Sequence, residues 1–453
     1  MLFNSLTFLI FFSVVMLSLY IFKKQNIRRI ILLLASYFFY GYWDWRFLSL
    51  ILLSTCVDYF AGERIYQTDD KRKKKLYLTL SLVTNLGLLG FFKYFNFFIE
   101  SANSVFSGLG LNLTTLNIIL PVGISFYTFQ TLSYTIDIYK GNLKPTSSFL
   151  NFAVFVSFFP QLVAGPIVRA KEFLPQIERG VRFDKREIHD GLQIFLFGMV
   201  KKVLIADRLA FFVDKVFEAP AVFDSLTIWL AVIAYSIQIY CDFSGYSDMA
   251  IGLAKCMGFD LPINFRMPYI SKNITEFWRR WHITLSTWLR DYLYIPLGGN
   301  RKGPKRTYIN LMLTMLLGGL WHGASWNFVI WGGIHGAGLA VHKNYMKKRG
   351  EEKEKKNIMT TAITWLTTYL FVITCWVFFR SQSFTISTII LKKMYLSITP
   401  AIEWLYTPAL MIIPIVIASH IFGIINKEKY PILNIQKPLN QYILFVVIFG
   451  LFF

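Results

Sequence analysis

The chain is divided into long apolar segments separated by short basic ones. Met1–Phe22 contains no charged side chain, and the same is true of Asn357–Phe379 and of Trp404–Asn426. A helix needs about 20 mostly apolar residues to cross the hydrocarbon core of a bilayer. Each segment is therefore long enough to span a membrane. We interpret Met1–Phe22 as a retained first span and not as a cleaved signal peptide, because it lacks both a basic start and a small-residue cleavage site.

Shorter apolar segments near the N-terminus predict a helical hairpin. Ile30–Tyr40 and Phe47–Tyr59 lie between the basic clusters Lys23–Arg29 and Lys71–Lys75. Such clusters are typical of the cytoplasmic side of a membrane. Since both ends of the pair are then cytoplasmic, we expect the chain to turn back at Gly41–Trp45.

A later apolar segment, Asn151–Val168, is also basic at both flanks and contains Pro160, Gly165 and Pro166. A single span cannot have both ends on one side of the membrane. Interrupted backbone is tolerated at membrane depth only where protein or a water-filled cavity surrounds it. We therefore predict a broken, re-entrant segment.

Two apolar arms, Thr307–Trp321 and Asn327–Val341, lie between the basic segments Arg301–Arg306 and Lys343–Lys348. At 1.5 Å per residue, an arm reaches about 22 Å. The hydrocarbon core is about 30 Å thick. We therefore expect the turn at Trp321–Trp326 to lie deep in the membrane, short of the outer face.

The composition supports an all-α polytopic membrane protein. Of the 453 residues, 55% are hydrophobic and 16% are charged, whereas soluble domains carry about 25% charged residues. Without an internal repeat or a soluble region, we expect one integral membrane domain over residues 1–453. The net charge of +21 favours anionic lipid headgroups over nucleic acid as the counter-charge, because Lys and Arg cluster in loops between apolar segments.

The turn between the two arms supplies the main candidate for chemistry. Ionisable side chains inside membrane segments are costly and often functional. His322 can accept a proton near neutral pH, and it lies between Trp321 and Gly323. A structural histidine bonded to a neighbouring carbonyl fits its position equally well. His335, further along the second arm, is a candidate supporting group.

Two further polar clusters interrupt the apolar pattern. The first is strongly amphipathic and predicts an interfacial or re-entrant helix whose cationic side faces an anionic group, with a plain interfacial helix as the alternative; it contains Glu276, Arg279, Arg280, Trp281, His282, Arg290 and Asp291. The second follows the apolar run Ser225–Cys241 and predicts ion pairs or a helix cap; it contains Asp242, Ser244 and Asp248. Its sequence only weakly suggests a metal, and we predict no metal site. The four cysteines have neither disulfide nor zinc spacing.

Several of these segments together resemble the membrane-bound O-acyltransferase (MBOAT) superfamily, and most closely its bacterial branch of alginate and peptidoglycan O-acetyltransferases. The matching stretches occur in order within residues 121–342 and are Pro121–Gln130, Gln161–Ile167, Tyr240–Asp248, Asn264–Arg301 and Gly318–Gly336. The resemblance implies roughly 11–12 spanning helices, with re-entrant or interfacial helices, around a central funnel. It also implies that His322 and His282 are catalytic, and that the other candidates bind the donor or support the site.

The same resemblance implies the substrates and partners. The expected donor is acetyl-CoA, reached from the cytoplasm, with no tightly bound cofactor. The expected acceptor side includes a periplasmic or extracellular esterase-like (SGNH-type) partner and a polysaccharide as final acceptor. The expected location is the cytoplasmic (inner) membrane of a bacterium.

Two other functions compete with acetyl transfer. A related enzyme in the superfamily transfers D-alanine to teichoic acid from a carrier protein. A transporter is the non-enzyme alternative, but the sequence has no inverted repeat and its polar residues gather in clusters. Alginate, peptidoglycan and other envelope glycans all remain open as the final acceptor.

Overall fold

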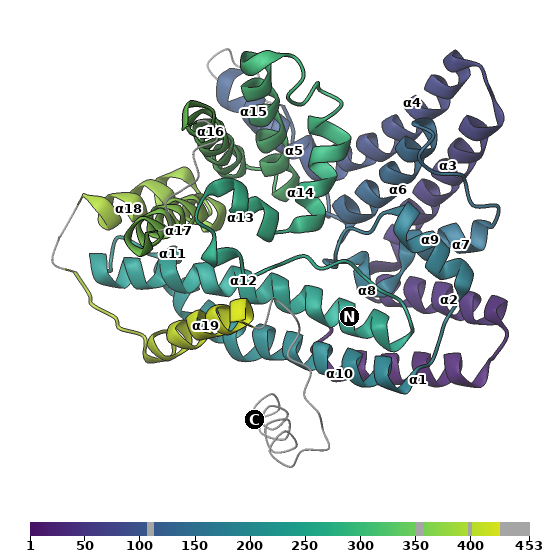
Figure 1. The fold of residues 1–453 in the computed structure, drawn as a ribbon, viewed down its shortest axis with the longest axis horizontal. Helices are drawn as coiled ribbons and strands as arrows, with labels where there is room; N and C mark the ends of the chain where they lie inside the picture. The colour runs from purple at the N-terminus through teal and green to yellow at the C-terminus, as the bar shows by residue number, and fades with distance from the viewer. Residues whose placement is uncertain (107–112, 350–356, 397–400, 426–453) are drawn as a thin grey trace. The chain divides into compact units, whose positions relative to one another are not determined.

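The computed structural model describes residues 1–106, 113–349, 357–396 and 401–425, and this part of the chain is almost entirely helical (Figure 1). The only β pairing among these residues is an isolated bridge between Phe223 and Ile402. Three helices in the described part are long and apolar enough to cross a membrane, namely Lys71–Phe106, Ser225–Cys256 and Ile358–Arg380. The all-α, multi-pass membrane class is therefore confirmed, while the count of 11–12 spanning helices stays a prediction.

The chain forms two compact units. One comprises Met1–Phe195 and Ser247–Pro262, and the other comprises Leu196–Tyr246 and Ile263–Phe453. The single membrane domain expected over residues 1–453 stays a prediction.

The first unit confirms the two N-terminal helices and a turn between them, but the turn lies at Trp45–Phe47 and not at Gly41–Trp45, and the two helices make few contacts with each other. Its helices are α1 (Leu6–Ile21), α2 (Gln25–Asp44), α3 (Leu48–Gln67), α4 (Lys71–Leu89), α5 (Phe95–Phe106), α6 (Ile124–Tyr139), α7 (Phe149–Ser157), α8 (Phe159–Leu162), α9 (Ala170–Arg179) and most of α10 (Lys185–Met199). A single 3₁₀ turn, Trp45–Phe47, separates α2 from α3. The Asp44 carboxylate accepts a hydrogen bond from the backbone N–H of Arg46 at 3.0 Å, which fixes the start of that turn.

The predicted interruption after residue 151 is also present. Helix α7 ends at Ser157, Phe158 leaves the helical conformation, and α8 is a single short turn. Gly165 follows at a point where a Cβ atom would meet the backbone of Gln161 at 2.5 Å. The broken backbone is therefore held in close packing, while its re-entry into the membrane stays a prediction.

Helices α3, α4 and α6 pack together around a buried carboxylate. Asp58 is fully buried and accepts hydrogen bonds from the Ser81 hydroxyl and from the Asn85 amide, the latter at 2.8 Å. Asn85 in turn accepts from Ser54 at 2.6 Å and from Thr131 at 3.2 Å. Because each bond requires a partner on another helix, the network sets the relative rotation of the three helices.

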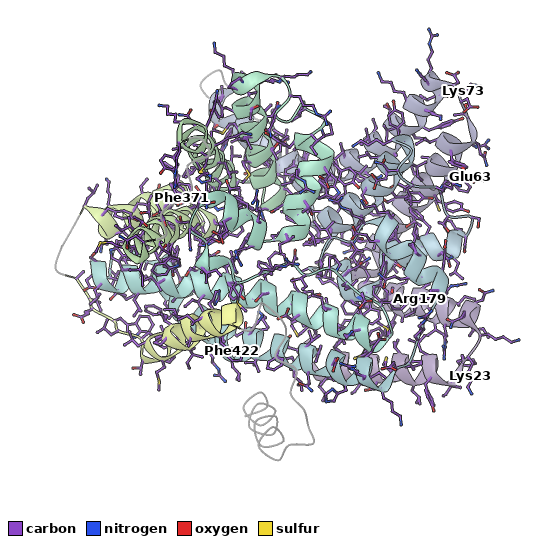
Figure 2. The ribbon with its side chains drawn as sticks, viewed as in Figure 1. Lys23, Glu63, Lys73, Arg179, Phe371 and Phe422 are labelled. Atoms are coloured by element: carbon purple, nitrogen blue, oxygen red, sulfur yellow. The ribbon has the colours of Figure 1, made fainter. Side chains whose placement is uncertain are left out.

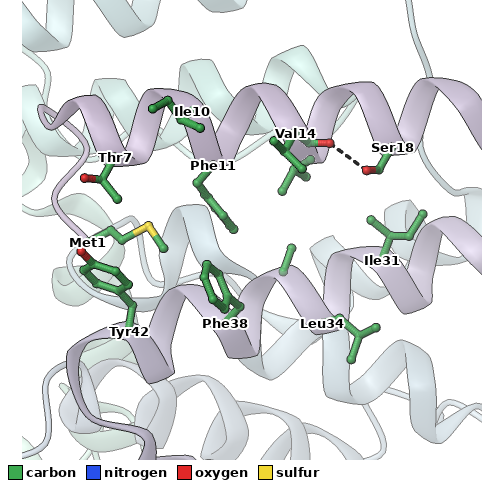
Figure 3. Close-up of a pocket in the computed structure, with 12 residues that line it drawn as sticks. Met1, Thr7, Ile10, Phe11, Val14, Ser18, Ile31, Leu34, Phe38 and Tyr42 are labelled. Carbon is green, nitrogen blue, oxygen red and sulfur yellow. Dashed lines mark hydrogen bonds between the residues drawn. The ribbon is translucent and has the colours of Figure 1, made fainter.

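An apolar groove of about 510 Å³ lies between α1 and α2 (Figure 3). Phe11 and Phe38 line it from opposite helices. Ser18 also lines it, but its hydroxyl donates to the Val14 carbonyl at 2.8 Å. The groove therefore offers almost no polar group, as expected for helices that face lipid.

The second unit contains the predicted two-armed hairpin. Its helices are α11 (Asp207–Glu218), the first part of α12 (Ser225–Cys256), α13 (Ile274–Arg280), α14 (Ile283–Leu289), α15 (Gly303–His322), α16 (Trp326–Arg349), α17 (Ile358–Arg380), α18 (Phe384–Tyr395) and α19 (Thr407–Ile425). Helix α15 begins one turn earlier than the apolar arm. That extra turn carries Lys305 and Arg306, so the apolar part keeps its expected length.

Helices α15 and α16 approach closely through glycines (Figure 1). A Cβ atom on Gly319 would collide with the Phe328 carbonyl, and one on Gly332 would collide with the Met315 carbonyl. Small residues permit such backbone contact between membrane helices. The pair therefore behaves as one rigid hairpin whose turn contains Gly323.

The two ends of this hairpin differ in charge. The start of α15 and the end of α16 carry Arg301, Lys302, Lys305, Arg306, Lys343, Lys347, Lys348 and Arg349, and no Asp or Glu occurs between residues 292 and 349. A hydrogen bond from the Lys343 ammonium to the Asn300 side chain joins the two cationic segments. At the other end, the Asn327 amide donates to the Ser381 carbonyl after α17, at 2.9 Å. The hairpin therefore holds its cationic end and the turn that contains His322 at opposite ends.

Candidate active site

His322 is the last residue of α15 and lies in a pocket of aromatic rings. Its ring centroid is 5.0 Å from that of Trp321, 5.1 Å from that of Trp331 and 5.2 Å from that of Phe379. All three rings meet the imidazole nearly edge to face, the geometry that aromatic pairs favour. The side chain is only partly buried. It is therefore held in position by packing and is still accessible to a substrate.

His282 lies behind His322 and is fully buried. It joins α13 to α14, and its backbone is left-handed, with φ of 42°. That conformation costs a residue other than glycine roughly 1–2 kcal/mol. Backbone strain of this kind is concentrated at functional sites. The ring centroid lies 4.6 Å from Phe243 and 6.3 Å from His322.

Hydrogen bonds to Asn264 determine which nitrogen of His282 carries a proton. The Asn264 Oδ1 atom accepts from the backbone N–H of Thr284 at 3.3 Å and from its hydroxyl at 2.9 Å. A backbone N–H can only donate, so the atom it meets is the amide oxygen. The His282 Nδ1 atom, 3.1 Å from the same oxygen, must then donate a proton. In neutral His282 the Nε2 atom is consequently an acceptor.

The His282 Nε2 atom has no hydrogen-bond partner among the described residues. His282 is fully buried, and burial disfavours the charged form of an imidazole. The 6.3 Å between the two ring centroids is too long for a direct N–H···N bond, which needs about 3 Å between nitrogens. The space suits one water molecule between the two imidazoles.

His335 lies one helical turn beyond Trp331 on α16. The two ring centroids are 4.8 Å apart, and Trp331 also contacts His322. His335 is fully buried, and Phe371 of α17, labelled in Figure 2, covers it at 5.7 Å. His335 therefore lies behind the site, and its supporting role stays a prediction.

Trp281 points into the aromatic core. Only 2% of its surface is exposed, and its ring centroid lies 4.9 Å from Trp376, 5.0 Å from Phe265 and 5.6 Å from Phe277. This packing anchors the chain directly before His282. Contact between Trp281 and the donor stays a prediction.

The charged residues of the amphipathic segment form local ion pairs. Arg280 donates to Glu276 at 3.0 Å, and Arg290 donates to Asp291 at 2.6 Å. Arg279 is exposed. These side chains are not members of the ring cluster around His322, and their role in binding the donor stays a prediction.

The polar cluster after Cys241 is divided between the two units. The predicted ion pair is confirmed for Asp242, whose carboxylate lies 2.6 Å from Lys202; the same ammonium is 2.8 Å from Asp207. Ser244 is buried, and Asp248 belongs to the first unit. No group of three or more His, Cys, Asp or Glu side chains in the described part of the chain could hold a metal. The expected absence of a metal stays a prediction.

Asn264, Phe243, Trp331 and Phe379 were not singled out from the sequence. Asn264 is the first residue of a stretch that resembles known enzymes, and Phe243 and Trp331 lie inside two others, so all three offered a signal. Phe379 lies outside residues 121–342, on a charge-free span. Only its contact with His322 distinguishes it from other apolar residues of that helix.

These features define a multi-pass, all-α membrane protein with a histidine-based site. Comparison with family models matches residues 140–379 to the MBOAT, membrane-bound O-acyltransferase family. The chain belongs to this family and is an O-acyltransferase. This membership overturns the transporter alternative.

Named relatives share most of the chain. The "probable alginate O-acetylase" of Pseudomonas putida is 44% identical over 400 residues, which cover 87% of this chain and 80% of the relative. The peptidoglycan O-acetyltransferase of Helicobacter pylori is 42% identical over 398 residues, covering 82% and 74%. The teichoic acid D-alanyltransferase of Bacillus subtilis is 30% identical over 271 residues, covering 56% and 67%.

Proposed function

We propose that this O-acyltransferase passes an acetyl group from cytoplasmic acetyl-CoA across the membrane for O-acetylation of a cell-envelope or extracellular polysaccharide. The observation that carries the proposal is the position of His322, at the end of a rigid hairpin opposite to its cationic end. The names of the relatives support acetyl as the transferred group and a polysaccharide as the final acceptor.

The donor approaches from the cationic end. Clusters of Lys and Arg mark the cytoplasmic side of membrane proteins, and the start of α15 and the end of α16 carry eight Lys and Arg side chains within residues 292–349, where no Asp or Glu occurs. Phosphate groups of CoA are attracted to such a surface. Acetyl-CoA acts as a substrate, and no tightly bound cofactor takes part. The enzyme resides in the cytoplasmic membrane of a bacterium.

His322 acts as the general base. It removes the proton from an acceptor hydroxyl while the hydroxyl oxygen attacks the thioester carbonyl carbon. The C–S bond then breaks, and the CoA thiolate takes up a proton from the imidazolium. General base catalysis by a placed histidine contributes about 10²–10⁴ in rate. Because its Nε2 atom is an acceptor, His282 accepts a hydrogen bond from the N–H of His322 through one water, which leaves the other nitrogen of His322 to take the hydroxyl proton.

The remaining candidates act at a distance from the transferred group. Trp321 and Trp331 hold the His322 ring, and His335 supports Trp331. The acceptor hydroxyl belongs to an esterase-like partner or to the polysaccharide itself on the far side of the membrane.

Transfer of D-alanine to teichoic acid is the second candidate function. It is favoured by the similarity to D-alanyltransferases, but those relatives are 29–30% identical and match only 50–56% of this chain. The higher identity and wider coverage of the acetylases favour acetyl transfer.

The test uses purified full-length protein in lipid nanodiscs with radiolabelled acetyl-CoA. We expect the wild-type protein to cleave the thioester, and we expect the rate of acetyl transfer to be at least about 100-fold lower in His322→Ala. His342→Gln is the matched control, because His342 lies on α16 but bonds Thr275 near the cationic end. Normal transfer by correctly folded His322→Ala would overturn the mechanism. If the protein cleaved the thioester of a D-alanyl carrier protein and left acetyl-CoA intact, D-alanyl transfer would be favoured.

A further inference from the structure

A polar pocket of about 270 Å³ lies where α17 ends, within the second unit. Its lining residues come from α11 and from the segment around the end of α17, and they are Asp214, Phe217, Glu218, Arg380 and Gln382. None of them belongs to the proposed reaction site. Apart from the Phe217 ring, every lining side chain ends in a charged group or an amide.

The charges of this pocket balance locally. Arg380 donates to the Asp214 carboxylate at 2.6 Å, and its guanidinium lies over the Phe217 ring at 5.7 Å. Lys215, just outside the lining, is 3.9 Å from Glu218. The pocket therefore presents donors and acceptors without a large net charge.

The pocket lies at the same end of the α15–α17 layer as His322. Arg380 directly follows Phe379, whose ring contacts His322 at 5.2 Å. The next residue, Ser381, accepts the hydrogen bond from Asn327 at the start of α16. Both links keep the pocket next to the turn that carries the histidine and away from the cationic end, where the donor enters.

We propose that this pocket is an acceptor-side subsite that binds one unit of a neutral polyhydroxyl compound, a neutral sugar. The proposal rests on the function proposed above and narrows its acceptor class. Two carboxylates, an amide and a guanidinium offer both acceptors and donors to neighbouring hydroxyl groups. The volume lies just below the range of about 300–1,000 Å³ for drug-sized ligands, which suits one sugar ring.

Two other ligands fit the pocket less well. A uronic-acid polymer carries one negative charge on each residue, and the pocket has no uncompensated cation to attract it, because Arg380 is already paired with Asp214. A peptide segment of a protein partner would be expected to place an apolar anchor in its site. Phe217 is 97% buried, so the pocket has almost no apolar wall for such an anchor.

The experiment measures ligand binding separately from turnover. Full-length protein in nanodiscs is titrated with chitotetraose, a neutral oligosaccharide, and with tetramannuronate, an acidic one. We expect chitotetraose to bind, and its dissociation constant to rise about tenfold in Asp214→Asn and in Gln382→Ala, as for loss of one hydrogen bond to a charged or amide group. Asp214 and Gln382 are both exposed, so these variants are expected to fold, and a thermal unfolding scan verifies it. Glu403→Gln, an exposed acid elsewhere in the same unit, is the control.

The outcomes separate this proposal from the proposed function. Equal binding of chitotetraose by wild type, Asp214→Asn and Gln382→Ala would overturn the subsite. If tetramannuronate bound in a way that depended on Asp214 or Gln382, the proposal that the ligand is neutral would be wrong. If a peptide from a partner bound in this pocket and chitotetraose did not, the proposal that the ligand is a sugar would be wrong. His322→Ala should bind chitotetraose normally, since the subsite does not include His322. Thioester cleavage that survives in His322→Ala would count against the mechanism alone.

Discussion

Replacing Asn264 by leucine tests whether one amide oxygen determines the tautomer and the position of His282. Leucine has nearly the same shape but no acceptor. The Oδ1 atom of Asn264 meets the His282 Nδ1–H, the Thr284 backbone N–H and the Thr284 hydroxyl. The hydroxyl can rotate toward another acceptor, whereas the two N–H groups are fixed. All three residues are buried.

The magnitude follows from those two fixed donors. A buried donor left without a partner costs about 1–3 kcal/mol, so Asn264→Leu should lower the free energy of unfolding by about 2–6 kcal/mol. The imidazole of His282 also loses the bond that selects its tautomer. We therefore expect acetyl transfer to fall by about tenfold or more even where the protein remains folded, since a wrong tautomer presents a proton where an acceptor is required.

The assay combines thermal unfolding in detergent with transfer from radiolabelled acetyl-CoA at a temperature well below the unfolding midpoint. Asn264→Asp is the matched control, because the carboxylate keeps an acceptor oxygen at the same place and should retain most of the activity. Wild-type transfer rates in folded Asn264→Leu would refute the assigned tautomer. Equal losses in Asn264→Leu and Asn264→Asp would show that the amide N–H₂, and not the oxygen, matters.

Two further predictions concern the packing of α15 against α16 and the buried hydrogen-bond network around Asp58. Gly332→Ala places a methyl group against the Met315 carbonyl and should lower the free energy of unfolding by about 1–3 kcal/mol and reduce transfer activity. Gly333→Ala, whose Cβ would be 3.5 Å from Leu316, should be tolerated. Thermal unfolding of the two variants is compared, and equal midpoints would contradict this prediction. Asp58→Leu leaves one N–H of the Asn85 amide without its acceptor, while the Ser81 hydroxyl can turn to Thr135 at 3.0 Å, and it should cost about 1–3 kcal/mol. Asp58→Asn keeps one carbonyl oxygen and should cost less, so equal unfolding midpoints for the two variants would show that the network contributes little.

The sequence by itself determined the helices and turns that can be recognised from consecutive residues. Charge-free stretches and basic flanks predicted the helices α2 and α3 with a turn between them, the interruption after residue 151, and the two arms that carry His322. A helix buried in lipid must form its own backbone hydrogen bonds and present an apolar surface. Both requirements are met by consecutive residues, so they can be recognised from the sequence. The turn beside Gly323 was likewise visible from the chain alone.

The environment of the two histidines was decided only by the tertiary structure. Residues from four separate segments meet there, including Phe243, Asn264, Trp331 and Phe379. The same holds for Asp58, whose partners lie on another helix. A hydrogen bond or ring contact between distant residues leaves no periodic trace along the chain. The sequence by itself therefore located His322 and the end of the hairpin that carries it, whereas the fold determined what surrounds the histidine and which nitrogen of His282 is an acceptor.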